Sequence, residues 1–284
     1  MPIMVVTDST SDLPQDLAQD LGITVVPLNV HSGTEEFKDG VDLTTDEFFR
    51  RLVAVPELPK TSQPSVGDFS SAYKALEDDA DGIVSVHISA KMSGTYNSAI
   101  QARSELDMST PIEVIDTLQA SMGLGLVAIR AATAARQGAS FEEVAGIARD
   151  AAERCRVFAG MDTLEYLIKG GRIGKARGLV GTLLRIRPMI LVREGEAHEL
   201  GKERTRAKML AKIQRTAEEF GPVEELCVLY STTPEDADQL ARGVSGLLPD
   251  GKEPLVTRFG PVLGTYVGPG AVGIGLLRAD EASA

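Results

Sequence analysis

Short apolar runs alternate with amphipathic segments through the first half of the chain. Each apolar run is flanked by turn-forming residues, a pattern typical of strands. The expected strands are Ile3–Val6, Ile23–Val30, Gly82–Ile88 and Ile112–Ile115, with a small hairpin at 32–37. The expected helices are 14–21, 46–53, 65–76, 94–106, 120–137 and 140–154. Strands that alternate with helices over short loops predict an α/β domain with a doubly wound, mainly parallel sheet.

The second half of the chain has a different pattern. A hairpin turn is expected at 193–196, with further strands at 226–230, 255–259 and 271–277. Helices are expected at 164–169, 176–184, 205–220 and 234–247. Hairpins mixed with helices predict an α+β domain with a mixed or antiparallel sheet. We therefore expect two domains, residues 1–158 and 159–284, with the boundary near Val157–Met161.

Composition excludes several classes of protein. The formal net charge of −12 argues against nucleic acid as a partner. Apolar stretches fall short of the roughly 20 residues that span a bilayer, so stable membrane insertion is not expected. The two cysteines are far apart and there are only three histidines, so we expect no metal site. Together these features predict a cytoplasmic protein with two buried thiols.

Charge is unevenly distributed in this acidic chain. Seven basic residues and no acidic one occur between Lys169 and Arg193. Such a segment can receive an anionic group or a charged partner. Alternatively, its members lie on solvated faces and pair with nearby acids. The sequence leaves both interpretations open.

Three hydroxyl-rich turns carry the candidate chemistry. They are Thr7–Asp12, Lys60–Ser65 and Ser89–Thr95, and each precedes a predicted helix. Helix N-termini present unpaired N–H groups, and hydroxyl groups add donors without adding charge. These turns can therefore hold a carboxylate or a phosphate. The alternative role of such serines is helix capping.

Familiar catalytic motifs do not fit. Gly174-Lys175 lacks the other residues of a nucleotide-binding P-loop, and the glycines of 268–273 precede an expected strand instead of a helix. An ester hydrolase with Ser93, His87 and Asp116 as a triad remains an alternative, because all three lie near the ends of predicted strands.

The hydroxyl-rich turns and two later segments together resemble the DegV family. Thr7–Pro14, Thr61–Ser65 and Met92–Ala99 are similar to its first three signatures. Asp162–Lys175 and Gly268–Ala271 are similar to its fourth signature and its C-terminal turn. These matches occur in order and span almost the whole chain.

The resemblance implies a function without catalysis by this chain. A long-chain fatty acid such as palmitate or oleate would lie between the domains, with its tail in an apolar tunnel of the C-terminal domain. The carboxylate would be held by Thr61, Ser62, Ser93 and Gly94. The protein would be a carrier, with no cofactor of its own, that presents the carboxyl group to a separate ATP-dependent fatty acid kinase subunit. The acyl phosphate formed would feed phospholipid synthesis.

One residue departs from the family pattern. Carriers of this family often have histidine before the C-terminal turn, where this chain has Tyr266. A phenol can still donate a hydrogen bond but carries no positive charge near neutral pH. Arg204 and Arg172 are, with Tyr266, the residues expected to face the partner. The departure leaves open a third function, a regulatory protein that senses fatty acids.

Overall fold

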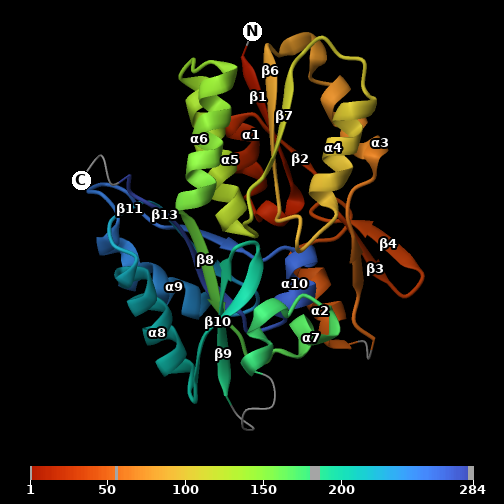
Figure 1. Ribbon diagram of the computed structural model, residues 1–284. Coiled ribbons are helices and arrows are strands. Elements are labelled where there is room, and N and C mark those ends of the chain that lie inside the picture. The colour runs from red at the N-terminus through yellow and green to blue at the C-terminus, as the bar shows by residue number, and fades with distance from the viewer. Residues whose placement is uncertain (1, 55–56, 180–185, 281–284) are drawn as a thin grey trace.

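The computed structural model describes residues 2–54, 57–179 and 186–280 and has two lobes (Figure 1). The N-terminal lobe contains a parallel four-stranded sheet of order β2-β1-β6-β7. Its strands are β1 (Ile3–Asp8), β2 (Ile23–Val26), β6 (Gly82–His87) and β7 (Ile112–Asp116). All six residues of β6 are buried, as its continuous apolar run predicts for a central strand.

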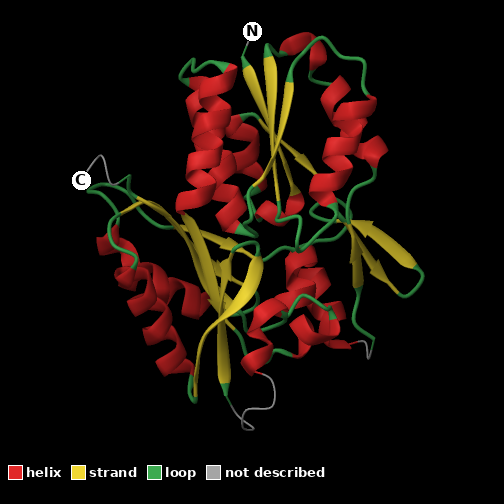
Figure 2. Cartoon of the chain, in the orientation of Figure 1, coloured by secondary structure: helices red, strands yellow, loops and turns green. Residues whose placement is uncertain are grey.

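Helices cover both faces of this sheet (Figure 2). One face packs against α3 (Val66–Lys74) and α4 (Thr95–Glu105), and the other against α1 (Gln15–Leu21), α5 (Met122–Arg136) and α6 (Phe141–Arg154). Capping boxes at Ser65 and Ser140 begin α3 and α6. The doubly wound arrangement predicted from the sequence is confirmed.

The C-terminal lobe contains a mixed six-stranded sheet of order β10-β9-β8-β13-β11-β12. Its strands are β8 (Cys155–Gly160), β9 (Arg187–Arg193), β10 (Glu196–Glu203), β11 (Val223–Tyr230), β12 (Leu255–Arg258) and β13 (Val272–Arg278). Within the described part of this sheet, β11 and β12 pair in parallel and the other neighbouring strands pair antiparallel. The outer face packs against α8 (Arg206–Glu219) and α9 (Pro234–Val244). This arrangement confirms the expected α+β character.

A smaller unit lies beside the two main sheets. Strands β3 (Asn29–Ser32), β4 (Glu35–Lys38) and β5 (Lys60–Ser62) form an antiparallel sheet of order β4-β3-β5. Next to it lie α2 (Thr45–Ala54), α7 (Glu165–Lys169) and α10 (Pro261–Val267) (Figure 1). None of the described helices is long and apolar enough to span a bilayer.

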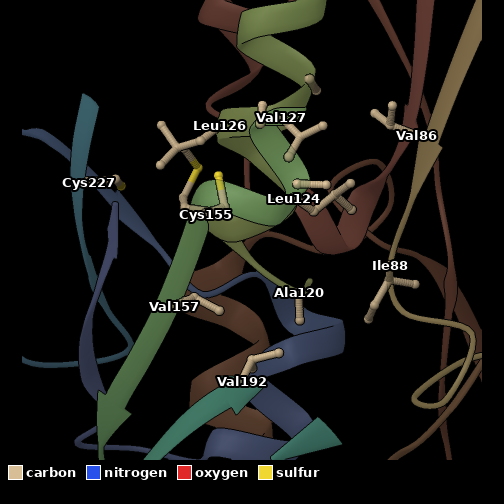
Figure 3. Packing of buried hydrophobic residues seen from close by; sticks show 14 of the residues in the cluster. Val86, Ile88, Ala120, Leu124, Leu126, Val127, Cys155, Val157, Val192 and Cys227 are labelled. Carbon is tan, nitrogen blue, oxygen red and sulfur yellow. The ribbon is translucent and has the colours of Figure 1, made fainter. Parts of the chain in front are cut away.

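Helix α5 packs between the two main sheets. Leu124 on α5 is fully buried and belongs to one apolar cluster with Val86 of β6, Ile88 just after β6 and Val157 of β8 (Figure 3). Both lobes therefore share one core. The same cluster borders a cavity between the two lobes.

Several expected elements differ in the structure. The expected strand Ile23–Val30 is broken at Pro27, which has no N–H to donate to a sheet, and its halves enter different sheets. A 3₁₀ turn, Gly174–Leu179, replaces the start of the expected helix 176–184, whose last five residues lie outside the described part. Residue 158 falls inside β8, so we propose to divide the lobes before Cys155.

Candidate functional site

A cavity lies where the two lobes and the small sheet meet. It encloses about 870 Å³ not occupied by protein atoms, counting the solvent at its opening. Small-molecule sites are typically concave and mostly apolar, with a few polar groups. Most of its wall is apolar, from both lobes and α10: Leu28, Ile88, Ala120, Val157, Ile190, Val192, Ala197, Phe259, Val262 and Leu263. Polar lining residues include Thr61, Gln63, Ser93, Arg172 and Tyr266, which we call the mouth.

Thr61 reaches the mouth from β5. Its hydroxyl lies 2.5 Å from the hydroxyl of Tyr266 on α10. Neighbouring residues of a strand point to opposite faces, so Ser62 points away from the cavity. The Ser62 hydroxyl bonds with His31 Nε2 at 2.9 Å and accepts from the Asn29 side chain at 3.3 Å. The structure thus places Thr61, but not Ser62, on the cavity wall.

Tyr266 is packed between two neighbours. The Arg172 guanidinium lies 5.2 Å from the centre of the Tyr266 ring, within cation–π distance. A Cβ atom on Gly170 would lie 2.5 Å from that ring, so glycine is required there. Arg172 also donates to the backbone carbonyls of Met92, at 3.3 Å, and Gly170, at 2.8 Å. Arg172 therefore joins the two sides of the mouth.

Ser93 lines the same cavity from the loop between β6 and α4. Its hydroxyl bonds with the Thr95 hydroxyl at 2.8 Å and accepts from the Thr95 N–H at 3.3 Å. Gly94 does not line the cavity. A Cβ on Gly94 would lie 2.9 Å from the Gln63 amide nitrogen, so this glycine makes room for the Gln63 side chain.

The triad considered for a hydrolase is not assembled. His87 is fully buried, and its Nδ1 bonds with Asp8 at 3.0 Å while its Nε2 bonds with Ser85 at 2.7 Å. Asp116 instead accepts from the N–H groups of Ala90 and Leu118. Both nitrogens of His87 are occupied, so none is free for Ser93. The histidine stabilises the turn after β1 through Asp8.

Sequence reasoning missed three lining residues with polar side chains. Gln63 lies in the predicted turn Lys60–Ser65 and Thr10 in the predicted turn Thr7–Asp12. The sequence does not predict that either side chain lines the cavity. Ser121 follows β7 and has a positive φ of 52°, unusual for a residue other than glycine. No sequence signal marks that backbone conformation.

Most of the basic segment between Lys169 and Arg193 is paired. Lys169 bonds with Glu165, Lys175 lies near Glu196, and Arg187 bonds with Asp162. These pairs support the interpretation of solvated, neutralised faces. Arg172 and Arg177 differ, because neither has a carboxylate within ion-pair distance in the described ranges. Arg204 is exposed after β10 and does not line the cavity.

Comparison with known proteins agrees with this geometry. The profile of the DegV family, a family of uncharacterised proteins, matches residues 2–279. The chain belongs to the DegV family.

The similarity to DegV relatives extends over whole chains. A DegV domain-containing protein of Streptomyces coelicolor is 34% identical, covering 96% of this chain and 97% of its own. A solved DegV family protein from Thermus thermophilus, described as fatty acid binding, is 36% identical with a TM-score of 0.91, covering 98% of this chain and all of its own. A stearic-acid-binding protein from Eubacterium ventriosum is 29% identical with a TM-score of 0.88, covering 97% and 98%.

Proposed function

We propose that this protein binds one long-chain fatty acid with its carboxylate at the mouth and its acyl chain in the cavity. The observation that carries the proposal is an apolar cavity between two lobes whose mouth offers the hydroxyls of Thr61, Ser93 and Tyr266. Fatty acid binding by solved DegV relatives supports it.

The acyl chain and the carboxylate contribute differently. Burial of each methylene group is favourable by about 0.8 kcal/mol, so the chain dominates affinity. A carboxylate without partners would be costly in this surrounding. Thr61 and Tyr266 bond with each other in the structure, and rotation of the two hydroxyls lets each donate to a carboxylate oxygen instead. Ser93 supplies a third donor, whereas Ser62 and Gly94 do not line the cavity and are not assigned to the carboxylate.

The finer proposal is a carrier role in the cytoplasm. The carboxylate would be presented to a separate ATP-dependent kinase subunit, where a carboxylate oxygen attacks the γ-phosphorus and the bond to ADP breaks. The exposed Arg204 would contact that subunit, and Arg172 and Tyr266 would lie at the point of transfer. Arg172 supports this assignment because its charge is not neutralised by a neighbouring carboxylate in the part of the chain that the structure describes.

Lipid analysis of the purified protein tests ligand binding. Organic extraction and mass spectrometry are expected to show a fatty acid, or delipidated protein is expected to bind added oleate. The double variant Thr61→Ala/Ser93→Ala should bind at least about tenfold more weakly, because two donors to a charged group are removed. Ser104→Ala, an exposed serine on α4, is the matched control. Binding to neither endogenous nor added acid rejects the proposal.

A second assay separates the carrier role from binding. Oleate-loaded protein is incubated with ATP and a fatty acid kinase subunit, and acyl phosphate is trapped with hydroxylamine. Hydroxamate that appears only when both proteins are present supports the carrier role. Binding without any hydroxamate contradicts that role and leaves the fatty acid site intact.

A further inference from the structure

Two buried acids of the N-terminal lobe meet the first turn of α10. Asp12 and Asp39 are only 7% and 4% exposed. One oxygen of Asp12 accepts a hydrogen bond from the Gly260 N–H at 2.8 Å. Asp39 lies on the same side, because a Cβ built on Gly260 would be 3.5 Å from its Oδ1. Both carboxyl groups therefore lie at the start of one helix.

Further bonds complete this contact between the lobes. The second oxygen of Asp12 accepts from the Ser121 hydroxyl at 2.6 Å, and its backbone carbonyl accepts from the Thr257 hydroxyl at 3.2 Å. The space at residue 260 is narrow, because a Cβ there would lie 3.2 Å from Asp12 Oδ1. Asp12 therefore ties the starts of α5 and α10 and the strand β12 together.

The same short helix forms part of the cavity wall. Helix α10 supplies the lining residues Val262, Leu263, Tyr266 and Val267. An α-helix rises about 1.5 Å per residue, so Tyr266 lies roughly 9 Å along the axis from Gly260. A shift at the first turn of so short a helix moves the Tyr266 hydroxyl relative to Thr61.

We propose that Asp12 and Asp39 are positioning residues for the fatty acid site, which hold α10 so that Tyr266 lies at the mouth. The inference rests on the proposed fatty acid binding. Neither acid lines the cavity. Both would act through α10, and Asp12 also contacts the lining residue Ser121.

The surroundings of the two acids predict that ligand affinity depends on pH. Burial raises the pKa of Asp12 to about 8 and that of Asp39 to about 7, and the charge of Asp8 adds to both shifts. The other titratable or charged groups nearby are the Cys227 thiol and Arg258, which lines the same surface hollow as the acids.

The sign of the pH effect follows from linkage. Acids exposed by movement of α10 away from the N-terminal lobe would return towards an ordinary pKa and release their protons. A rise of pH through 7 and 8 therefore disfavours the arrangement that binds the ligand, and affinity falls. Asparagine imitates a protonated acid, because its amide oxygen can accept the same N–H bond.

Calorimetric titration of delipidated full-length protein with oleate at pH 6 and pH 9 tests the inference. Asp12→Ala and Asp39→Ala should bind at least about tenfold more weakly than wild type at pH 6, whereas Asp12→Asn and Asp39→Asn stay within about threefold. Wild-type affinity should fall at least about tenfold by pH 9, and less in each asparagine variant. Asp20→Asn, which removes an exposed acid on α1, should follow wild type. The titration of oleate itself is common to all variants.

Two outcomes overturn the inference: wild-type affinity in the alanine variants, or an unchanged pH effect in the asparagine variants. Wild type that binds no oleate at either pH rejects the proposed function instead. Hydrogen–deuterium exchange of residues 260–267 in ligand-free protein then still tests whether Asp12 and Asp39 hold α10 in place. Exchange should be faster in the alanine variants than in wild type, and equal exchange overturns the inference.

Discussion

The hydroxyl of Tyr266 lies 2.5 Å from that of Thr61, although 205 residues separate them in the chain. This bond joins α10 to the small sheet at the mouth of the cavity. Each hydroxyl has one proton and can accept as well as donate. The pair can therefore exchange its mutual bond for two bonds to a carboxylate.

Tyr266→Phe should weaken oleate binding about tenfold, the equivalent of one hydrogen bond to a charged group. The aromatic ring remains in place for Arg172, so the free energy of unfolding should change by less than about 1 kcal/mol. Titration calorimetry and urea unfolding measure the two quantities. Tyr96→Phe on α4 is the matched control and should leave affinity unchanged. Equal affinity in both variants would remove Tyr266 from the carboxylate site.

Gly170→Ala should reduce affinity although residue 170 does not line the cavity. The added Cβ would lie 2.5 Å from the Tyr266 ring, so the ring must leave the mouth and affinity should fall by about tenfold or more. Gly146→Ala on α6 is the control, because its Cβ would meet no atom within 4 Å. That variant should bind normally and be more stable by about 0.5–1 kcal/mol. Normal binding by Gly170→Ala would contradict the required position of the ring.

The strands of the N-terminal sheet could be predicted because each buried strand is a short apolar run in the sequence. The apolar run at 82–88 predicts a central strand, and β6 is one. The sequence could not predict whether Thr61 or Ser62 faces the cavity. It predicts a turn at 60–65, whereas the structure has a three-residue strand there. Once that strand is known, alternation allows only one of the two residues to face the cavity.

Helix α10 was missed for a related reason. Its sequence, 261–267, is short and flanked by glycines, and isolated helices of this length are not stable. Its tertiary contacts include the hydrogen bond from the Gly260 N–H to Asp12. Contacts between residues more than 200 positions apart leave no pattern in a single sequence.

Leu124→Ala should strongly destabilise both lobes together. Leu124 is fully buried on α5, within the cluster shared by β6 and β8, and truncation of such a leucine costs about 3–5 kcal/mol. Thermal unfolding should show one transition at a lower temperature. Val53→Ala, at a position 66% exposed, should shift stability by less than about 0.5 kcal/mol. Loss of only one of two separate transitions would show that the lobes do not share a core.

Stability should decrease as pH rises from about 4 to 8, in part through Asp12 and Asp39. Their pKa values rise from 3.8 to about 8 and about 7 on folding, because burial disfavours the charged form. The folded protein therefore retains protons that the unfolded chain releases. The resulting stabilisation is complete below pH 4 and is lost as pH passes 7 and 8.

The double variant Asp12→Asn/Asp39→Asn should lose this part of the pH dependence. Each acid can contribute a slope of up to about 1.4 kcal/mol per pH unit between its unfolded and folded pKa values. Urea unfolding at pH 5, 6, 7 and 8 should give a flatter profile for the double variant than for wild type. Asp20→Asn removes one exposed acid and should keep the wild-type slope. Parallel profiles for wild type and the double variant would mean that the two carboxyl groups titrate alike in the folded and unfolded chain.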